Sequence, residues 1–131
     1  MNVSTYQAKV YPEPPCWSLV ADVLIVERGL AVDEYKTISE SIRQLSASLR
    51  VQAAAVAFRL ELHKGEHGFA QISEPVDYAV VLMGKTIKMG IHHSGIYYQG
   101  KVLHALETGT LYQDMASLRD EYALVEFWSR A

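Results

Sequence analysis

The sequence predicts an α+β domain in which N-terminal helices pack on an antiparallel β-sheet. In the first half of the chain, apolar residues recur at helical spacing. From Phe69 onward, short runs of β-branched and aromatic residues alternate with glycine-containing turns. Helices followed by a run of strands are typical of the α+β class, and we expect the helices to pack on one side of the sheet. We expect residues 1–131 to form one domain, because a chain of 131 residues has room for a single core.

Composition excludes several classes of function. Half of the residues are apolar and 21% are charged, which is ordinary for a globular protein. The net charge of −3 and the lack of any long basic cluster argue against nucleic acid or an anionic membrane as partner. We see no secretory signal peptide at the start, and no apolar run approaches the roughly 20 residues of a membrane span.

The first predicted helix begins at the only cysteine of the chain. The prolines of Tyr11–Pro15 make a stiff, extended entry, and apolar residues on helical spacing then run from Cys16 to about Arg28. Gly29 is placed to end this helix. Cys16 therefore lies in the first turn, where unpaired N–H groups and the helix dipole favour a thiolate. The alternative is a small apolar residue on the buried face.

A second helix is predicted from about Ile38 to Leu60, after the capping-box pattern of Thr37–Glu40. The segment His63–Gly68 that follows is polar and contains two glycines, so we expect a loop. Its two histidines have i,i+4 spacing, but the glycines disfavour a helix and no further ligands lie nearby. We therefore expect no metal site here.

The remaining chain is predicted as strands with one short helix. The expected strands are 69–72, 78–83, 87–89, a hairpin over 93–106 and a last strand at 123–128. Residues 107–110 close the second arm of the hairpin, and Leu111–Asp120 has the pattern of a short helix.

The hairpin brings two histidines together. Gln99-Gly100 forms the tight turn, and counting from Tyr98 opposite Lys101 puts Gly95 opposite His104. Because side chains alternate in a strand, His93 and His104 then lie on one face as diagonal neighbours, with Gly95 between them. A slip of one residue would separate them. The alternative is a half-buried hairpin with two incidental histidines.

The cysteine and the histidines together have the composition of a nucleophilic site. A thiol at a helix start, a histidine on a strand and a second polar ring on the adjacent strand are what a cysteine nucleophile needs. The first imidazole relays the proton, and the third group fixes the tautomer of that imidazole.

Four stretches also resemble a known family. They are Cys16-Trp-Ser-Leu-Val20, Val80-Val-Leu-Met83, His93-Ser-Gly-Ile-Tyr97 and Val102-Leu-His-Ala105. In this order they resemble the NlpC-type papain-fold cysteine peptidases, which cut bacterial cell-wall peptides. The resemblance is greatest to the compact version in tail-assembly or tail-tip proteins of phages and prophages, whose closing strand is similar to Val125–Trp128.

The resemblance implies a papain-like NlpC-type fold and a set of roles. Cys16 would be the nucleophile, His93 the general base and acid, and His104 the orienting residue. Substrate binding would fall to Tyr11, Trp17 and Ser94. The enzyme would hydrolyse peptidoglycan stem peptides, in this family typically after a γ-linked D-glutamyl residue, with no metal and no cofactor. Phage tail proteins would be its partners, and it would reside in the virion, or in the host cytoplasm before assembly.

Two alternatives remain open at this point. The family usually has Asp or Asn before the cysteine and Gly two positions after it, where this chain has Pro15 and Ser18. These departures are compatible with a catalytically inactive structural component of a tail tip that retains the fold. A papain-fold acyltransferase would use the same three residues as the hydrolase.

Overall fold

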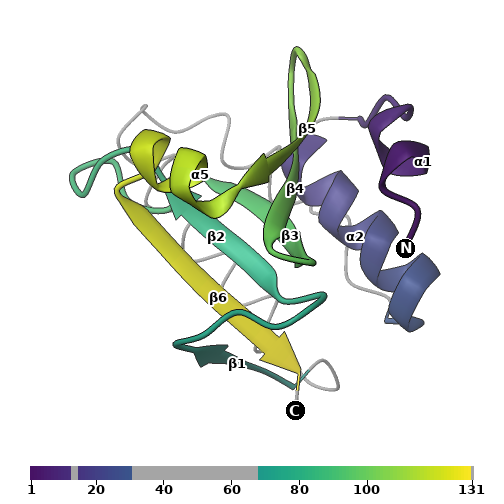
Figure 1. Ribbon diagram of the computed structural model, residues 1–131, viewed down its shortest axis with the longest axis horizontal. Helices are drawn as coiled ribbons and strands as arrows, with labels where there is room; N and C mark the ends of the chain where they lie inside the picture. The colour runs from purple at the N-terminus through teal and green to yellow at the C-terminus, as the bar shows by residue number, and fades with distance from the viewer. Residues whose placement is uncertain (13–14, 31–67, 131) are drawn as a thin grey trace, which may run out of the picture.

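The computed structural model of the chain describes residues 1–12, 15–30 and 68–130 (Figure 1). In this part of the chain the fold is α+β, with a six-stranded antiparallel sheet and three helices. The elements are α1 Val3–Gln7, α2 Pro15–Arg28, β1 Phe69–Ile72, β2 Val80–Gly84, β3 His93–Tyr98, β4 Lys101–Leu106, β5 Gly109–Asp114, α5 Met115–Glu121 and β6 Leu124–Arg130. The helix predicted from Ile38 to Leu60 and most of the loop from His63 lie outside the described residues.

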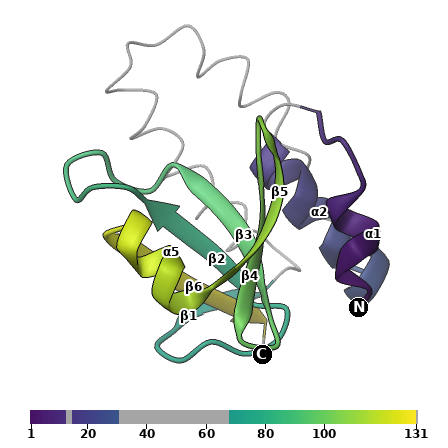
Figure 2. The same ribbon diagram turned by 45° about the horizontal axis from the view of Figure 1, so that its top comes forward.

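The sheet has the strand order β1-β6-β2-β3-β4-β5, and every neighbouring pair is antiparallel. Its inner strand β2 is buried along its whole length, so both of its faces need a covering layer. Helix α2 supplies that layer on one face and α5 on the other, as Figure 2 shows. The prediction that the helices lie on one side of the sheet is therefore wrong for α5.

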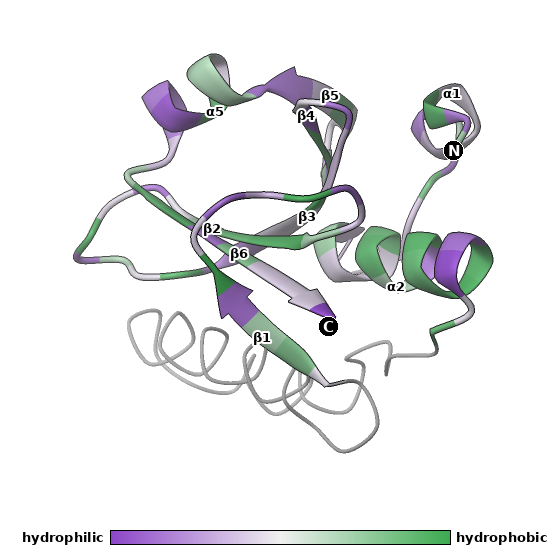
Figure 3. Ribbon diagram, turned by 60° about the horizontal axis from the view of Figure 1, so that its bottom comes forward, coloured by the Kyte–Doolittle hydropathy of each residue, from purple (hydrophilic) through white to green (hydrophobic). Residues whose placement is uncertain are grey.

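Helix α2 confirms the predicted first helix. It begins at Pro15 and ends at Arg28, and Gly29 follows with a φ of 65°. Much of the α2 ribbon has the green of apolar residues in Figure 3. Five of the side chains of α2 are at most 1% exposed: Trp17, Leu19, Val20, Val23 and Leu24. They pack against the face of the sheet that carries Leu82 and Ile96. Helix α2 contacts β3 and β4. Each Å² of apolar surface that this packing removes from water stabilises the fold by roughly 25 cal/mol.

Three local expectations are corrected by the structure. Residues 87–89 form turns rather than a strand, and the short helix α1 was not expected. Residues Gly109–Asp114 pair along the whole of β4, so the predicted helix over 111–120 begins only at Met115. Asp114 marks that start, because its side chain accepts a hydrogen bond of 2.8 Å from the Ser117 N–H. Pairing with β4 thus outweighs the helical pattern of residues 111–114.

The histidine hairpin has the predicted turn and register. Gln99 and Gly100 both have positive φ, and Tyr98 pairs with Lys101 and Ile96 with Leu103. The ladder ends at Ile96–Leu103, so the expected ladder pairs beyond it, such as Gly95–His104, do not form. The two strands approach closely at this point, since a Cβ on Gly95 would lie 2.8 Å from the Leu103 carbonyl oxygen and 3.0 Å from the His104 Cβ.

Replacing Gly95 with alanine is expected to lower the free energy of unfolding by about 1–3 kcal/mol, because the added methyl meets backbone that cannot move freely. Urea titration of both proteins measures this difference. Thr108→Ala, in the exposed β4–β5 turn, is the control and should change stability by less than about 0.5 kcal/mol. Equal stability of Gly95→Ala and the wild type would contradict the close approach of the two strands.

Candidate cysteine and histidine site

The two hairpin histidines are in direct contact. His93 Nε2 lies 2.9 Å from His104 Nδ1, and the ring planes are nearly perpendicular with centroids 5.0 Å apart. His104 is fully buried and His93 is 7% exposed. The prediction that both rings lie on the same side of the sheet is confirmed by this contact.

A chain of hydrogen bonds continues from the histidine pair across the sheet. His104 Nε2 lies 2.9 Å from Gln113 Oε1 on β5. The amide nitrogen of Gln113 lies 3.0 Å from Ser117 Oγ and 3.3 Å from Glu121 Oε1, both on α5. Sequence reasoning missed Gln113, because residues 111–120 were expected to be helical. The only available signal was the alternation along 109–114, which is weak in so short a strand.

Tyr122, at the end of α5, covers the histidine pair. Its ring stacks on His93 at a centroid distance of 5.8 Å with an interplanar angle of 8°, and it meets His104 edge-on. Tyr122 is itself 4% exposed. Sequence reasoning also missed this residue, since nothing local marks a tyrosine after a short helix as part of a distant site.

Both histidines are held in the neutral state. Burial lowers the pKa of His93 to about 3, and His104, His92 and Lys85 act in the same direction. Burial also lowers the pKa of His104, although the hydrogen bond to Gln113 and the charge of Glu121 oppose it. Neutral imidazoles are the form that a general base requires.

Cys16 lies in the first turn of α2, as predicted, but its thiol is buried and only 7% exposed. Burial raises the pKa of the thiol, and the nearby Ser94 hydroxyl and the backbone of Ser94, Trp17 and Cys16 lower it by less. The expectation that the helix start favours a thiolate is therefore wrong for the resting protein. Loss of water around the sulfur outweighs the nearby N–H groups.

The polar neighbour of the thiol is Ser94, the residue that directly follows His93. The Ser94 hydroxyl is fully buried and makes no hydrogen bond of ordinary geometry with any other part of the described chain. Its contact with Cys16 is therefore a close polar approach rather than a formed hydrogen bond, which fits the weakness of sulfur as a partner.

Cys16 and His93 approach β3 from opposite faces. The thiol belongs to the core cluster under α2, whereas His93 pairs with Met83, whose side chain packs in the cluster under α5. No hydrogen bond joins Cys16 to His93 among the described residues. Tyr122 interacts with both residues. Its ring stacks on His93, and a negative charge on Cys16 would raise the pKa of its phenol. The predicted approach of a His93 nitrogen to the thiol stays a prediction.

The three residues predicted to bind substrate are placed differently from one another. Trp17 and Ser94 are fully buried, so neither presents its side chain to solvent. Tyr11 is partly exposed, and its hydroxyl donates a hydrogen bond of 2.7 Å to Asp22 Oδ2. Tyr11 also lines an open depression on the surface.

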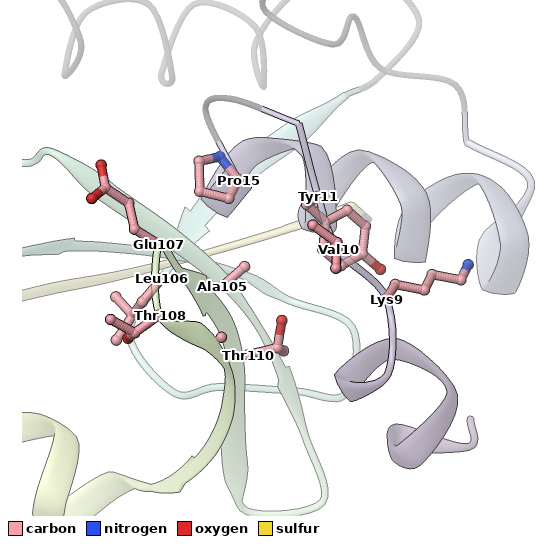
Figure 4. Close-up of a pocket in the computed structure, with 10 residues that line it drawn as sticks. Lys9, Val10, Tyr11, Pro15, Ala105, Leu106, Glu107, Thr108 and Thr110 are labelled. Atoms are coloured by element: carbon pink, nitrogen blue, oxygen red, sulfur yellow. The ribbon is translucent and has the colours of Figure 1, made fainter.

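That depression is a groove of about 470 Å³ between residues 9–11 and Pro15 on one side and the turn that joins β4 to β5 on the other (Figure 4). Pro15 forms one wall beside Cys16, and Ala105 forms the other beside His104. Lys9 and Glu107 place one charge of each sign along its rim. The groove therefore runs past the residues that neighbour the thiol and the second imidazole.

Two further features concern metals and membranes. Within residues 1–12, 15–30 and 68–130, no group of three or more His, Cys, Asp or Glu side chains is arranged to hold a metal ion. In the same part of the chain, none of the helices has the length and apolar character needed to cross a membrane.

Comparison with known proteins gives no match to a protein-family model, a curated protein or a solved structure. The resemblance to NlpC-type peptidases therefore rests on the four short stretches of sequence alone.

The neutral histidines predict that acid destabilises the fold. An unfolded histidine has a pKa near 6.5, whereas folded His93 has a pKa of about 3. Between these values the unfolded chain binds more protons, so the free energy of unfolding falls as the pH drops below about 6.5. The slope for one such residue approaches 1.4 kcal/mol per pH unit at about 25 °C. His104 adds to this slope in the same direction.

Urea titrations at several pH values between 7.5 and 4.5 measure this dependence in the wild type and in His93→Gln. The variant lacks the buried imidazole, and its stability should fall less steeply with acid. Parallel curves for the two proteins would show that His93 is not held neutral by burial.

Proposed function

We propose that this chain is a cysteine hydrolase with an NlpC-type papain-like fold, acting on amide bonds of peptidoglycan stem peptides. The observation that carries this proposal is the hydrogen-bonded series from His93 through His104 to Gln113, in a fold that also holds a buried Cys16 at a helix start. A nucleophile, a neutral base and an orienting group are thus supplied by α2, β3 and β4 in the order that the resemblance implies.

The chemistry follows from these groups. Cys16 Sγ bonds to the carbonyl carbon of the substrate as its proton passes to His93 Nδ1, the ring nitrogen that does not contact His104. The C–N bond then breaks, and the leaving amine takes the proton from His93. Water attacks the thioester, gives one proton back through His93 to sulfur, and releases the carboxylic acid. Backbone N–H groups at the start of α2 would stabilise the oxyanion.

The substrate would occupy the groove lined by Tyr11, Pro15 and Ala105, because Pro15 and Ala105 are the chain neighbours of Cys16 and His104. An extended peptide fits such a groove, and the opposite charges of Lys9 and Glu107 match a chain that carries both amino and carboxyl groups. The scissile bond is the one implied by the resemblance, after a γ-linked D-glutamyl residue. The same resemblance implies a phage or prophage tail as the location of the protein, with tail proteins as partners and with no cofactor.

A specific observation favours a second candidate, an inactive structural component of a tail tip. Cys16 and His93 are each only 7% exposed, and they are not hydrogen-bonded to each other. A site in this state must open before a peptide carbonyl can reach the sulfur. A protein kept only for its contacts would have no need to open.

The two candidates are separated by digestion of purified muropeptides, with the products resolved by liquid chromatography and mass spectrometry. The hydrolase should release fragments with a new amine and a new γ-glutamyl carboxyl terminus, and Cys16→Ala should release none. Alanine fits the small buried position of Cys16, so the variant should remain folded and circular dichroism provides the control. Absence of products from the wild type across several cell-wall chemotypes would favour the structural candidate.

A further inference from the structure

The hydrogen-bonded series from His93 to α5 ends on a group that can act only as an acceptor. Gln113 holds its amide nitrogen 3.0 Å from Ser117 Oγ and 3.3 Å from Glu121 Oε1, and its carbonyl oxygen 2.9 Å from His104 Nε2. A hydroxyl can donate or accept, but an ionised carboxylate can only accept. Glu121 is therefore the member of the series that distinguishes the two orientations of the Gln113 amide.

The orientation of the amide determines where the protons lie on both imidazoles. With the Gln113 oxygen facing it, His104 Nε2 must carry the proton that is donated. In a neutral His104 the other nitrogen, Nδ1, then has a free lone pair. His93 Nε2 lies 2.9 Å from that lone pair and must donate to it, so His93 Nδ1 is left without a proton.

The reverse orientation would give the opposite result. Rotating the amide by half a turn would place its oxygen against the carboxylate of Glu121, where two acceptors repel each other. It would also present N–H to His104 Nε2, which would move the proton of His104 to Nδ1. His93 Nε2 would then accept a hydrogen bond from His104 Nδ1, and the ring proton of His93 would lie on Nδ1. A protonated Nδ1 has no lone pair, so it could not act as the base.

We propose that Glu121 and Gln113 are positioning residues that select the tautomer of His93 in which Nδ1 is free to take a proton from a thiol. The series works through rigid elements, since Gln113 directly precedes Asp114, whose side chain caps α5 at Ser117. Ser117 and Glu121 are one helical turn apart and so lie on the same side of α5. The role of this tautomer in catalysis rests on the proposed hydrolase, whereas the tautomer itself does not.

The tautomer can be measured without any substrate. Two-dimensional ¹H–¹⁵N spectra that correlate ring nitrogens with ring protons distinguish a protonated from an unprotonated imidazole nitrogen. In uniformly labelled wild type at pH 7.5, His93 should show protonated Nε2 and unprotonated Nδ1, and His104 should show the same pattern. Assignment uses the spectra of His93→Gln and His104→Gln.

Glu121→Gln is the test of the proposed selection. Its amide can donate as well as accept, so the Gln113 amide loses its preferred orientation, and His93 should show a mixture of both tautomers. Asp120→Asn removes the same charge at the neighbouring exposed position of α5 and should leave the wild-type pattern unchanged. Glu121→Asp retains an acceptor-only group, so His93 should show the wild-type tautomer in this variant.

The outcomes separate this inference from the proposed function. A wild-type spectrum with the proton on His93 Nδ1, or a Glu121→Gln spectrum identical to that of the wild type, would overturn the inference whether or not the protein hydrolyses peptides. The expected tautomers in a protein without hydrolytic activity would uphold the inference and overturn the hydrolase. In an active protein, Glu121→Gln should lower kcat in proportion to the lost tautomer and leave KM unchanged.

Discussion

His93→Ala is expected to lower the rate of stem-peptide hydrolysis by about 10²- to 10⁴-fold or to below detection, whereas His92→Ala should retain hydrolysis. His93 bonds to His104 and lies beside Ser94, the neighbour of the thiol. His92 Nε2 instead accepts a hydrogen bond of 3.1 Å from the Lys85 backbone N–H. Initial rates on a purified muropeptide measure the difference.

The two variants form a matched pair, because each removes one imidazole from adjacent positions. His92→Ala should cost about 1 kcal/mol of stability through the lost bond to Lys85, so both proteins are compared at a temperature where circular dichroism shows them folded. Loss of activity in His92→Ala with activity kept in His93→Ala would assign the base to His92 instead.

Trp17→Ala is expected to lower the free energy of unfolding by about 3–5 kcal/mol, which is much of the stability of a small domain. Trp17 is fully buried in the cluster between α2 and the sheet, next to Leu82 and Ile96. Removing the indole leaves a large cavity directly behind the start of the helix that carries Cys16. Urea titration measures the loss, and Trp17→Phe, which keeps an aromatic ring, should lose less.

The same variants test the role in substrate binding that the sequence resemblance assigns to Trp17. A buried core residue changes stability and alters activity only through the fold. A residue that contacts substrate would instead raise KM and leave the unfolding curve in place. The second pattern in Trp17→Phe would contradict the burial of this side chain.

The sequence predicts the histidine hairpin well because its information is local. The Gln99-Gly100 turn sets the register, and the alternation of side chains then puts His93 and His104 on one face. The α+β class and helix α2 are confirmed for similar reasons, since helical spacing, prolines and a terminal glycine lie close together in the chain. The resemblance to a family suggests which residues act in catalysis, but it does not predict the distances between them.

The remaining parts of the site depend on contacts between distant segments. Gln113 belongs to a strand only because β4 pairs with it, and Tyr122 reaches His93 only because α5 covers the second face of the sheet. The protonation of Cys16 was wrongly predicted for a related reason. The helix start is visible in the sequence, but the burial that opposes its effect depends on how α2 packs against β3.

The proposed pairing of Cys16 with His93, as a nucleophile with its base, is tested most directly by the pH dependence of Cys16 alkylation. Burial raises the pKa of the thiol and lowers that of His93 to about 3, so at neutral pH both groups are uncharged. A thiol that passes its proton to His93 should react with iodoacetamide at a rate that is level between about pH 5 and 8 and rises only when the thiol itself ionises. His93→Ala should lose the level region and retain the alkaline rise. A single alkaline rise that is the same in the wild type and in His93→Ala would contradict the pairing of the two residues.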